Sequence, residues 1–156
     1  MRRKDREIKD KKEIIDIIER SEECYLAMSV NDQPYVIPVN FGFQDETIYI
    51  HCAAEGKKIE MIKQNPNVSL AFTAEAETSL TGPPNTWTTF YQSAIASGKA
   101  ELVLDVNERQ KGMNAFQKHY TGRFMDFSER DLKKIMLIRV KITEMTGKAN
   151  LPKDEK

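Results

Sequence analysis

A histidine and two lysines lie close together in the chain and could serve a phosphate-bearing ligand. His51 ends a stretch with strand-like alternation, and Gly56, Lys57 and Lys58 follow it directly before a helical pattern. Backbone N–H groups at a helix start attract anions, as do the helix dipole and lysine side chains. We therefore expect an anion pocket for the phosphate of a cofactor, with His51 beside it.

The two residue types also have simpler interpretations. Ile48, Ile50 and Cys52 alternate with Tyr49 and His51. If the apolar face is core, His51 points outward toward a groove beside the pocket. It could equally be a surface or interface histidine held by hydrogen bonds. Lys57 and Lys58 could be exposed helix lysines, although the dipole disfavours cations at a helix start and a bound phosphate would offset that repulsion.

The sequence lacks the motifs of nucleotide binding, nucleophilic catalysis and metal binding. The sequence has no Walker loop and no G-x-G-x-x-G motif, no serine lies in a nucleophile elbow, and no acidic pair has a spacing suited to acid–base catalysis. Its two histidines and two separated cysteines, Cys24 and Cys52, do not have the spacing of a metal site or a disulfide framework. We expect no bound metal and two buried free thiols.

The composition limits the partners. The 156 residues fit one domain, 1–156, and Lys+Arg and Asp+Glu both total 24, so the formal net charge is zero. This balance gives no support for nucleic acid as a partner. No apolar stretch approaches the roughly 18 residues of a membrane span, and no signal segment opens the chain. We expect a cytoplasmic protein.

Strands outnumber helices in the sequence pattern. Alternation predicts six strands, over residues 24–30, 35–43, 47–52, 68–72, 91–105 and 136–142. Helical spacing or caps predict helices over residues 10–20, 57–64 and 108–120, and another after Ser128. Pro38 indicates an edge or bulged strand, and Gly98 a bulge.

Residues 74–89 have turn composition, with Gly82, Pro83 and Pro84, and look like a long loop of the kind that is functional or disordered. Several consecutive strands are predicted with no helix between them, which argues against a parallel sheet. The predicted fold is therefore mainly β (α+β), a six-stranded antiparallel barrel with flanking helices.

Several short segments resemble a known family in the same order. They are Tyr35-Val36-Ile37-Pro38-Val39-Asn40-Phe41-Gly42-Phe43, Ile48-Tyr49-Ile50-His51, Gly56-Lys57-Lys58, Asn65-Pro66-Asn67-Val68-Ser69-Leu70 and Ser97-Gly98-Lys99-Ala100. This series resembles the pyridoxamine 5′-phosphate oxidase-like, FMN-binding split-barrel superfamily. The opening residues 1–7, Tyr91-Gln92-Ser93 and the closing Thr146-Gly147-Lys148 are similar to its Nim nitroimidazole-resistance branch.

The resemblance implies a homodimer with FMN in two grooves between the subunits. By position, the flavin ring would be lined by Tyr35, Val36, Ile37, Pro38, Val39 and Asn40. Ile50 and His51 would flank the ribityl and phosphate region, and Lys57 and Lys58 would bind the phosphate. Ser93 would contact the cofactor from a neighbouring strand, and His51 would act at the substrate.

Two departures from the family pattern bear on the reaction. The oxidases proper carry an arginine and a lysine at the positions of Tyr35 and Asn40, which argues against pyridoxamine phosphate oxidation. The Nim branch often has a cysteine before Tyr91, where this chain has residues 85–90 without one.

The leading hypothesis is an FMN-dependent reductase of small nitroaromatic compounds. The alternatives are a non-catalytic flavin-binding or flavin-sensing protein, and a split barrel that uses haem or a deazaflavin.

Overall fold

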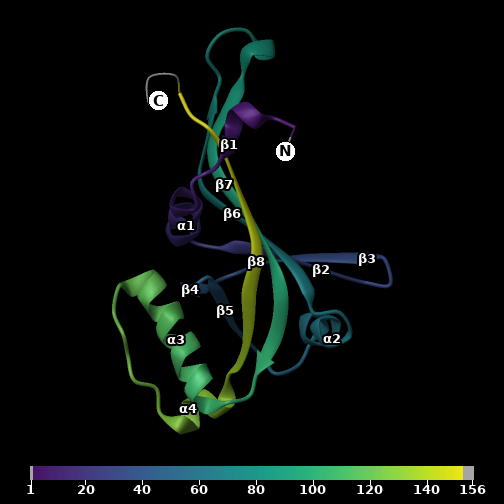
Figure 1. Cartoon of the computed structure of the whole chain (residues 1–156), viewed down its shortest axis with the longest axis vertical. Helices are drawn as coiled ribbons and strands as arrows, with labels where there is room; N and C mark the ends of the chain where they lie inside the picture. The colour runs from purple at the N-terminus through teal and green to yellow at the C-terminus, as the bar shows by residue number, and fades with distance from the viewer. Residues whose placement is uncertain (1, 153–156) are drawn as a thin grey trace.

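One antiparallel sheet organises the protein. The computed structural model describes residues 2–152, and its sheet has eight strands. Seven follow the order β3-β2-β6-β7-β8-β5-β4, and β1 (Glu7–Ile8) pairs with β8. The other strands are β2 (Cys24–Val30), β3 (Gln33–Val39), β4 (Gly42–Gln44), β5 (Thr47–Cys52), β6 (Asn67–Ser79), β7 (Thr88–Val103) and β8 (Met136–Asn150). The predicted class, mainly antiparallel β with helices, is confirmed (Figure 1).

The structure has two strands more than the six predicted: the short β1, which no alternation marks, and β4, because the alternation over residues 35–43 spans two strands. β3 and β4 follow each other in the chain, yet they lie at the two ends of the strand order. Asn40 and Phe41 carry the chain from one edge of the sheet to the other. Alternation shows which face a side chain takes, but it does not show that the strand has changed its partner.

Both short hairpins close through two-residue turns. Asn31 and Asp32 join β2 to β3, and Asp45 and Glu46 join β4 to β5, all four with positive φ between 50° and 60°. Two consecutive residues of positive φ form the turn whose twist matches that of paired strands, and Asn and Asp tolerate it best among residues with side chains. The edge position predicted from Pro38 is also confirmed, since β3 pairs only with β2.

Residues 74–89 are not a long loop. β6 and β7 continue past the barrel as an arm, paired from Thr73–Ser93 out to Ser79–Thr88, and β8 runs beside β7 as far as Tyr91 (Figure 1). Only the tip is irregular, with a short 3₁₀ helix, Pro84–Thr86. Along β6 the arm reads Ala74-Glu75-Ala76-Glu77-Thr78-Ser79, and because its apolar side chains are small, the alternation is too weak to identify a half-buried strand.

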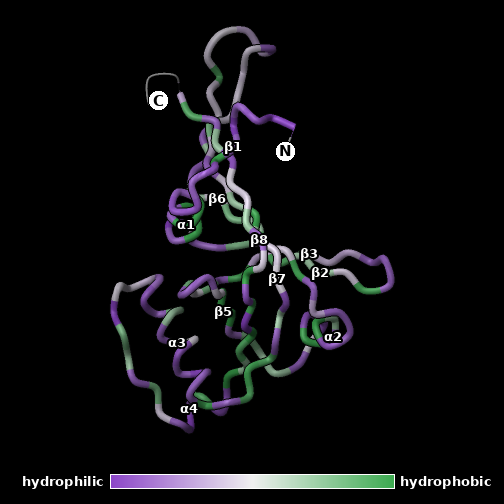
Figure 2. Tube along the Cα trace, in the orientation of Figure 1, coloured by the Kyte–Doolittle hydropathy of each residue, from purple (hydrophilic) through white to green (hydrophobic). Residues whose placement is uncertain are grey.

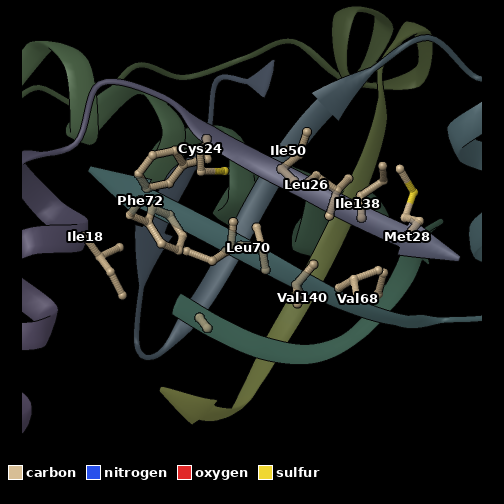
Figure 3. Packing of buried hydrophobic residues seen from close by; sticks show 14 of the residues in the cluster. Ile18, Cys24, Leu26, Met28, Ile50, Val68, Leu70, Phe72, Ile138 and Val140 are labelled. Atoms are coloured by element: carbon tan, nitrogen blue, oxygen red, sulfur yellow. The ribbon is translucent and has the colours of Figure 1, made fainter. Parts of the chain in front are cut away.

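The main core fills the barrel. Figure 3 shows Leu26, Leu70, Phe72, Ile50 and Val140 pointing toward one another from β2, β6, β5 and β8. Helix α1 (Lys11–Arg20) places Ile14, Ile17 and Ile18 against this core, and its trace in Figure 2 has a hydrophobic and a hydrophilic side. Helix α2 (Lys57–Gln64) adds Ile59, Met61 and Ile62.

Helix α3 (Val106–Thr121) covers a second, smaller core with α4 (Glu129–Lys134). Tyr49 and Leu137 lie beneath α3, so Tyr49 is buried although it shares a strand face with His51. The buried Arg109 ties the layers together by donating to the backbone oxygens of Val103 and Leu132.

Gly42 fixes how closely α3 approaches β4. A Cβ at this position would overlap the backbone of Ala115 and Phe116, so the helix rests directly on the strand. This contact sets the position of the side chains on the exposed part of α3, which matters for the site below.

None of the helices in the described part of the chain, residues 2–152, is long and apolar enough to cross a membrane. The predicted domain 1–156 also includes Met1 and residues 153–156, which lie outside the described residues.

Candidate functional site

The barrel is open between the edges of β3 and β5, and the candidate site lies along this opening. β3 pairs only with β2, while β4 covers β5 only from Thr47 to Tyr49. Among the described residues, the sheet therefore leaves two edges without a strand partner: the outer edge of β3, and the stretch of β5 from Ile50 to Cys52 on the side that faces away from β8. We call the space between residues 35–40 and residues 50–58 the seam. Unpaired strand edges offer backbone donors and acceptors to a ligand.

Tyr35 and Lys57 mark one end of the seam. The Lys57 Nζ atom lies 4.3 Å from the centroid of the Tyr35 ring, a cation–π contact of about 0.5–1 kcal/mol at an exposed position. Lys57 is the first residue of α2, and Lys58, half-buried, is the second. The structure thus brings the predicted lysines to the same end of the seam as Tyr35.

The start of α2 has the features of an anion-binding helix terminus. Its N-cap residue is Gly56, with φ of 119°, and no side chain among the described residues caps it. The first backbone N–H groups of the helix and two lysine side chains therefore share one small region. Positive φ at Gly56 is strained for other residues, so glycine is the natural choice for this turn.

His51 and Asn40 mark the other end. The His51 ring contacts Phe116 of α3 edge-on, with ring centroids 4.6 Å apart and an interplanar angle of 85°. Partial burial and then the charge of Lys58 lower the pKa of His51 below its ordinary value of 6.5. The imidazole is therefore mainly neutral at pH 7, able to accept a proton at one nitrogen and donate from the other.

The other predicted residues of β3 and β5 divide by face. Tyr35, Ile37 and Val39 turn toward the barrel, whereas Val36 and Pro38 are exposed on the outside. Ile50 is 1% exposed, so only its backbone can contact a ligand in the seam. The inward-facing side chains of β3 and the buried side chain of Ile50 agree with a site that uses the backbone of these strands.

Ser93 does not join the other predicted residues within one chain. It pairs with Lys148 on β8, whereas His51 pairs with Leu137 on the same strand. Eleven residues of β8 separate the two positions, about 36 Å at 3.3 Å per residue. Ser93 therefore lies far along the sheet from His51 within one chain.

Phe116 and Tyr120 border the site, although sequence reasoning did not single them out as site residues. They are one turn apart on α3, within the helix predicted over residues 108–120, and their ring centroids are 5.0 Å apart. Helical spacing predicts the helix, but it does not show that one end of it reaches past the core to His51. His119 on the same helix is half-buried, and its Nε2 lies 2.9 Å from the Ser21 carbonyl oxygen.

Within residues 2–152, no group of three or more His, Cys, Asp or Glu side chains gathers in a way that could hold a metal ion.

Comparison with known proteins defines the class of this fold and site. The family model described as pyridoxamine 5′-phosphate oxidase matches residues 10–149, so the chain belongs to that family. This confirms the resemblance seen in the sequence. No curated protein matches the chain.

Solved structures share the fold. One is a protein from Bacteroides thetaiotaomicron VPI-5482 assigned to 5-nitroimidazole antibiotic resistance, with 30% identity and a TM-score of 0.81, covering 91% of this chain and 85% of that one. An FAD and haem binding protein from Mycobacterium smegmatis has 14% identity and a TM-score of 0.81, covering 96% and 78%. An FAD-binding protein from Mesorhizobium loti has 20% identity and a TM-score of 0.68, covering 94% and 98%. The last two likenesses show the fold alone.

Proposed function

We propose that this protein binds FMN in the seam and acts as a reductase of small nitroaromatic compounds. The observation that carries the proposal is that two unpaired strand edges converge on a helix start bearing two lysines. Family membership and the 30% identical relative assigned to nitroimidazole resistance support it.

The residues of the seam fit the parts of such a cofactor. Lys57, Lys58 and the first N–H groups of α2 would bind the phosphate, which a concentration of positive charge favours. The backbone of residues 35–40 and of Ile50 would hold the ring system and the ribityl chain. Because Lys57 lies over Tyr35, we place the phosphate at the Tyr35 end and the ring toward Asn40 and His51. A bound flavin supplies the electron chemistry of the reaction.

His51 has the geometry of a residue that acts at the substrate. Its ring lines a pocket at the Asn40 end of the seam, and its lowered pKa keeps it mainly neutral at pH 7. A neutral imidazole can orient a polar substituent or transfer a proton to it. No acidic side chain among the described residues lines this pocket beside it.

We further propose that the protein is a homodimer. An outer face of the sheet carries Tyr25, Val36, Pro38, Ala71 and Ile95 on adjoining strands, with Tyr25 47%, Val36 59% and Ile95 45% exposed. Exposed apolar surface of this kind marks interaction sites. Ser93 lies two residues from Ile95, so both project from the same side of β7. Packing two such faces would offer Ser93 to the seam of the partner.

A flavin-binding protein without a reaction is the second candidate, and a different cofactor is the third. Proteins with this fold include an FAD and haem binding protein and an FAD-binding protein, so FAD and haem are the alternative cofactors for the seam. FMN is favoured because one helix start provides for one phosphate group.

The test uses purified protein loaded with FMN, reduced without oxygen and mixed with 2-methyl-5-nitroimidazole. We expect the flavin to reoxidise faster than without the compound, and His51→Ala to slow this step while FMN stays bound. Reoxidation at an equal rate with and without the compound would leave a flavin-binding protein without reductase activity. A haem-type absorption spectrum of the purified protein would replace the flavin assignment.

A further inference from the structure

A pocket between α3 and the end of the seam is lined by both apolar and polar side chains. Its volume is about 410 Å³. Met113, Phe116, Tyr120 and Phe127 supply most of its apolar wall, while Asn40 and His51 lie where the pocket meets the seam. We call this space the α3 pocket.

The aromatic wall of the α3 pocket is anchored in the core. Phe116 contacts both His51 and Tyr120, Tyr120 contacts His119, and His119 packs on Phe41 with ring centroids 4.4 Å apart. Phe41 in turn packs edge-on against Phe72 inside the barrel, at 5.1 Å. A wall supported through successive ring contacts has a defined shape before any ligand enters.

Hydrogen bonds of Tyr120 fix the polar rim as well. Its hydroxyl accepts from the Asn40 side-chain amide and from the Phe41 backbone N–H, each at 3.2 Å, and donates to the Glu22 carbonyl at 2.6 Å. Asn40 is thereby held at the pocket border. One amide hydrogen and the amide oxygen of Asn40 remain for a ligand.

We propose that the α3 pocket binds a small planar aromatic compound that carries one polar substituent. Its ring lies against Phe116 and Tyr120, and the substituent reaches the Asn40 amide and the His51 imidazole. The volume is at the small end of ligand pockets, which run from about 300 to 1,000 Å³, so one or two fused rings fit. That this compound is the substrate rests on the proposed function; its binding does not.

Methionine methyl groups provide a direct readout without FMN. In protein labelled at its methionine methyls, nitrobenzene should shift the Met113 signal in NMR spectra and leave the Met28 signal, which belongs to a different surface pocket, unchanged. Nitrocyclohexane has the same nitro group on a non-planar ring and should bind roughly tenfold more weakly, because it lacks aromatic ring contacts. Equal affinity for the two compounds, or shifts at Met28 alone, would overturn the proposal.

Phe116→Ala and Phe124→Ala form a matched pair. Phe124 is an exposed phenylalanine outside the pocket, so its loss should change nothing, whereas Phe116→Ala should weaken nitrobenzene binding about tenfold. Phe116→Leu replaces it if the alanine variant does not fold. Unchanged nitrobenzene affinity in the Phe116 variant would contradict the assignment.

FMN affinity, measured on the same proteins by flavin fluorescence, separates the two proposals. Nitrobenzene binding at Met113 without any FMN binding would sustain the pocket and remove the flavin reductase. FMN binding with no shift of the Met113 signal would overturn the α3 pocket and leave the flavin proposal standing.

Discussion

His51 lies where the seam meets the α3 pocket, and its surroundings favour the neutral imidazole. The His51 ring packs edge-on against Phe116 while part of the residue stays exposed at the seam, so a partial loss of hydration disfavours the charged form, and Lys58 adds repulsion. The neutral imidazole can accept a proton, whereas the charged imidazolium can only donate one. The pKa of His51 therefore decides which of these it does at a given pH.

An NMR titration of His51 tests this environment. We expect a pKa below 6.5, and we expect Lys58→Ala to raise it because one positive charge is removed. Lys63→Ala, on the last turn of the same helix, is the control and should leave the value unchanged. A pKa at or above 6.5 in the wild-type protein would contradict the described burial.

The same pKa has a consequence for stability. The unfolded chain binds a proton at His51 more readily than the folded protein does. The contribution of His51 to the free energy of unfolding is therefore fully present above about pH 6.5 and is lost as the pH falls through the lower, folded value.

At the level of single residues, the sequence indicated the seam better than the α3 pocket. His51, Gly56 and the two lysines form a local pattern, and alternation alone turns His51 away from the barrel core. Tyr49 shares that face but is buried, because α3 lies over it, and no local pattern shows where a distant helix packs. The site role of Phe116 was missed for the same reason.

At the level of elements, the position of α3 depends on Gly42. We expect Gly42→Ala to destabilise the protein by about 1–3 kcal/mol, because the added Cβ overlaps the helix backbone rather than a movable side chain. Urea denaturation measures the change. Movement of α3 should also alter the α3 pocket, so nitrobenzene affinity should fall in the same variant. A denaturation midpoint equal to that of the wild type would show that α3 does not rest on β4 as described.

Elements with local sequence signals were predicted, and elements that depend on strand pairing were not. The helices over residues 57–64 and after Ser128 were predicted correctly, since caps and breakers are local signals. The change of partner at Asn40 and the length of the β6–β7 arm were not, because each depends on which strands pair. Gly82, Pro83 and Pro84 mark only the tip of that arm.

At the level of the whole molecule, Ser93 and the outer face point to the same arrangement. Ser93 is about 36 Å along β8 from the level of His51, and the outer face lies beside it. A dimer through this face would let each chain complete the seam of the other.

Ile95→Glu tests the dimer. A charge at the centre of an apolar interface is costly, so we expect the variant to sediment as a monomer while the wild type sediments as a dimer. Leu104 is an exposed leucine just after β7 and outside the proposed interface, so the Leu104→Glu variant should remain dimeric. A wild-type monomer at micromolar concentration would contradict the proposed assembly.

Binding of FMN in the seam depends most on the lysines at the start of α2. Titrating the purified protein with FMN and following the quenching of flavin fluorescence measures the affinity for wild type, for Lys57→Ala/Lys58→Ala and for the control Lys63→Ala. We predict that the double variant raises Kd by at least about tenfold, because charge-assisted contacts to the phosphate are lost, and that the control binds as the wild type does. Equal affinity in all three proteins, or no binding of FMN by the wild type, would contradict the assignment of this helix start as the phosphate site.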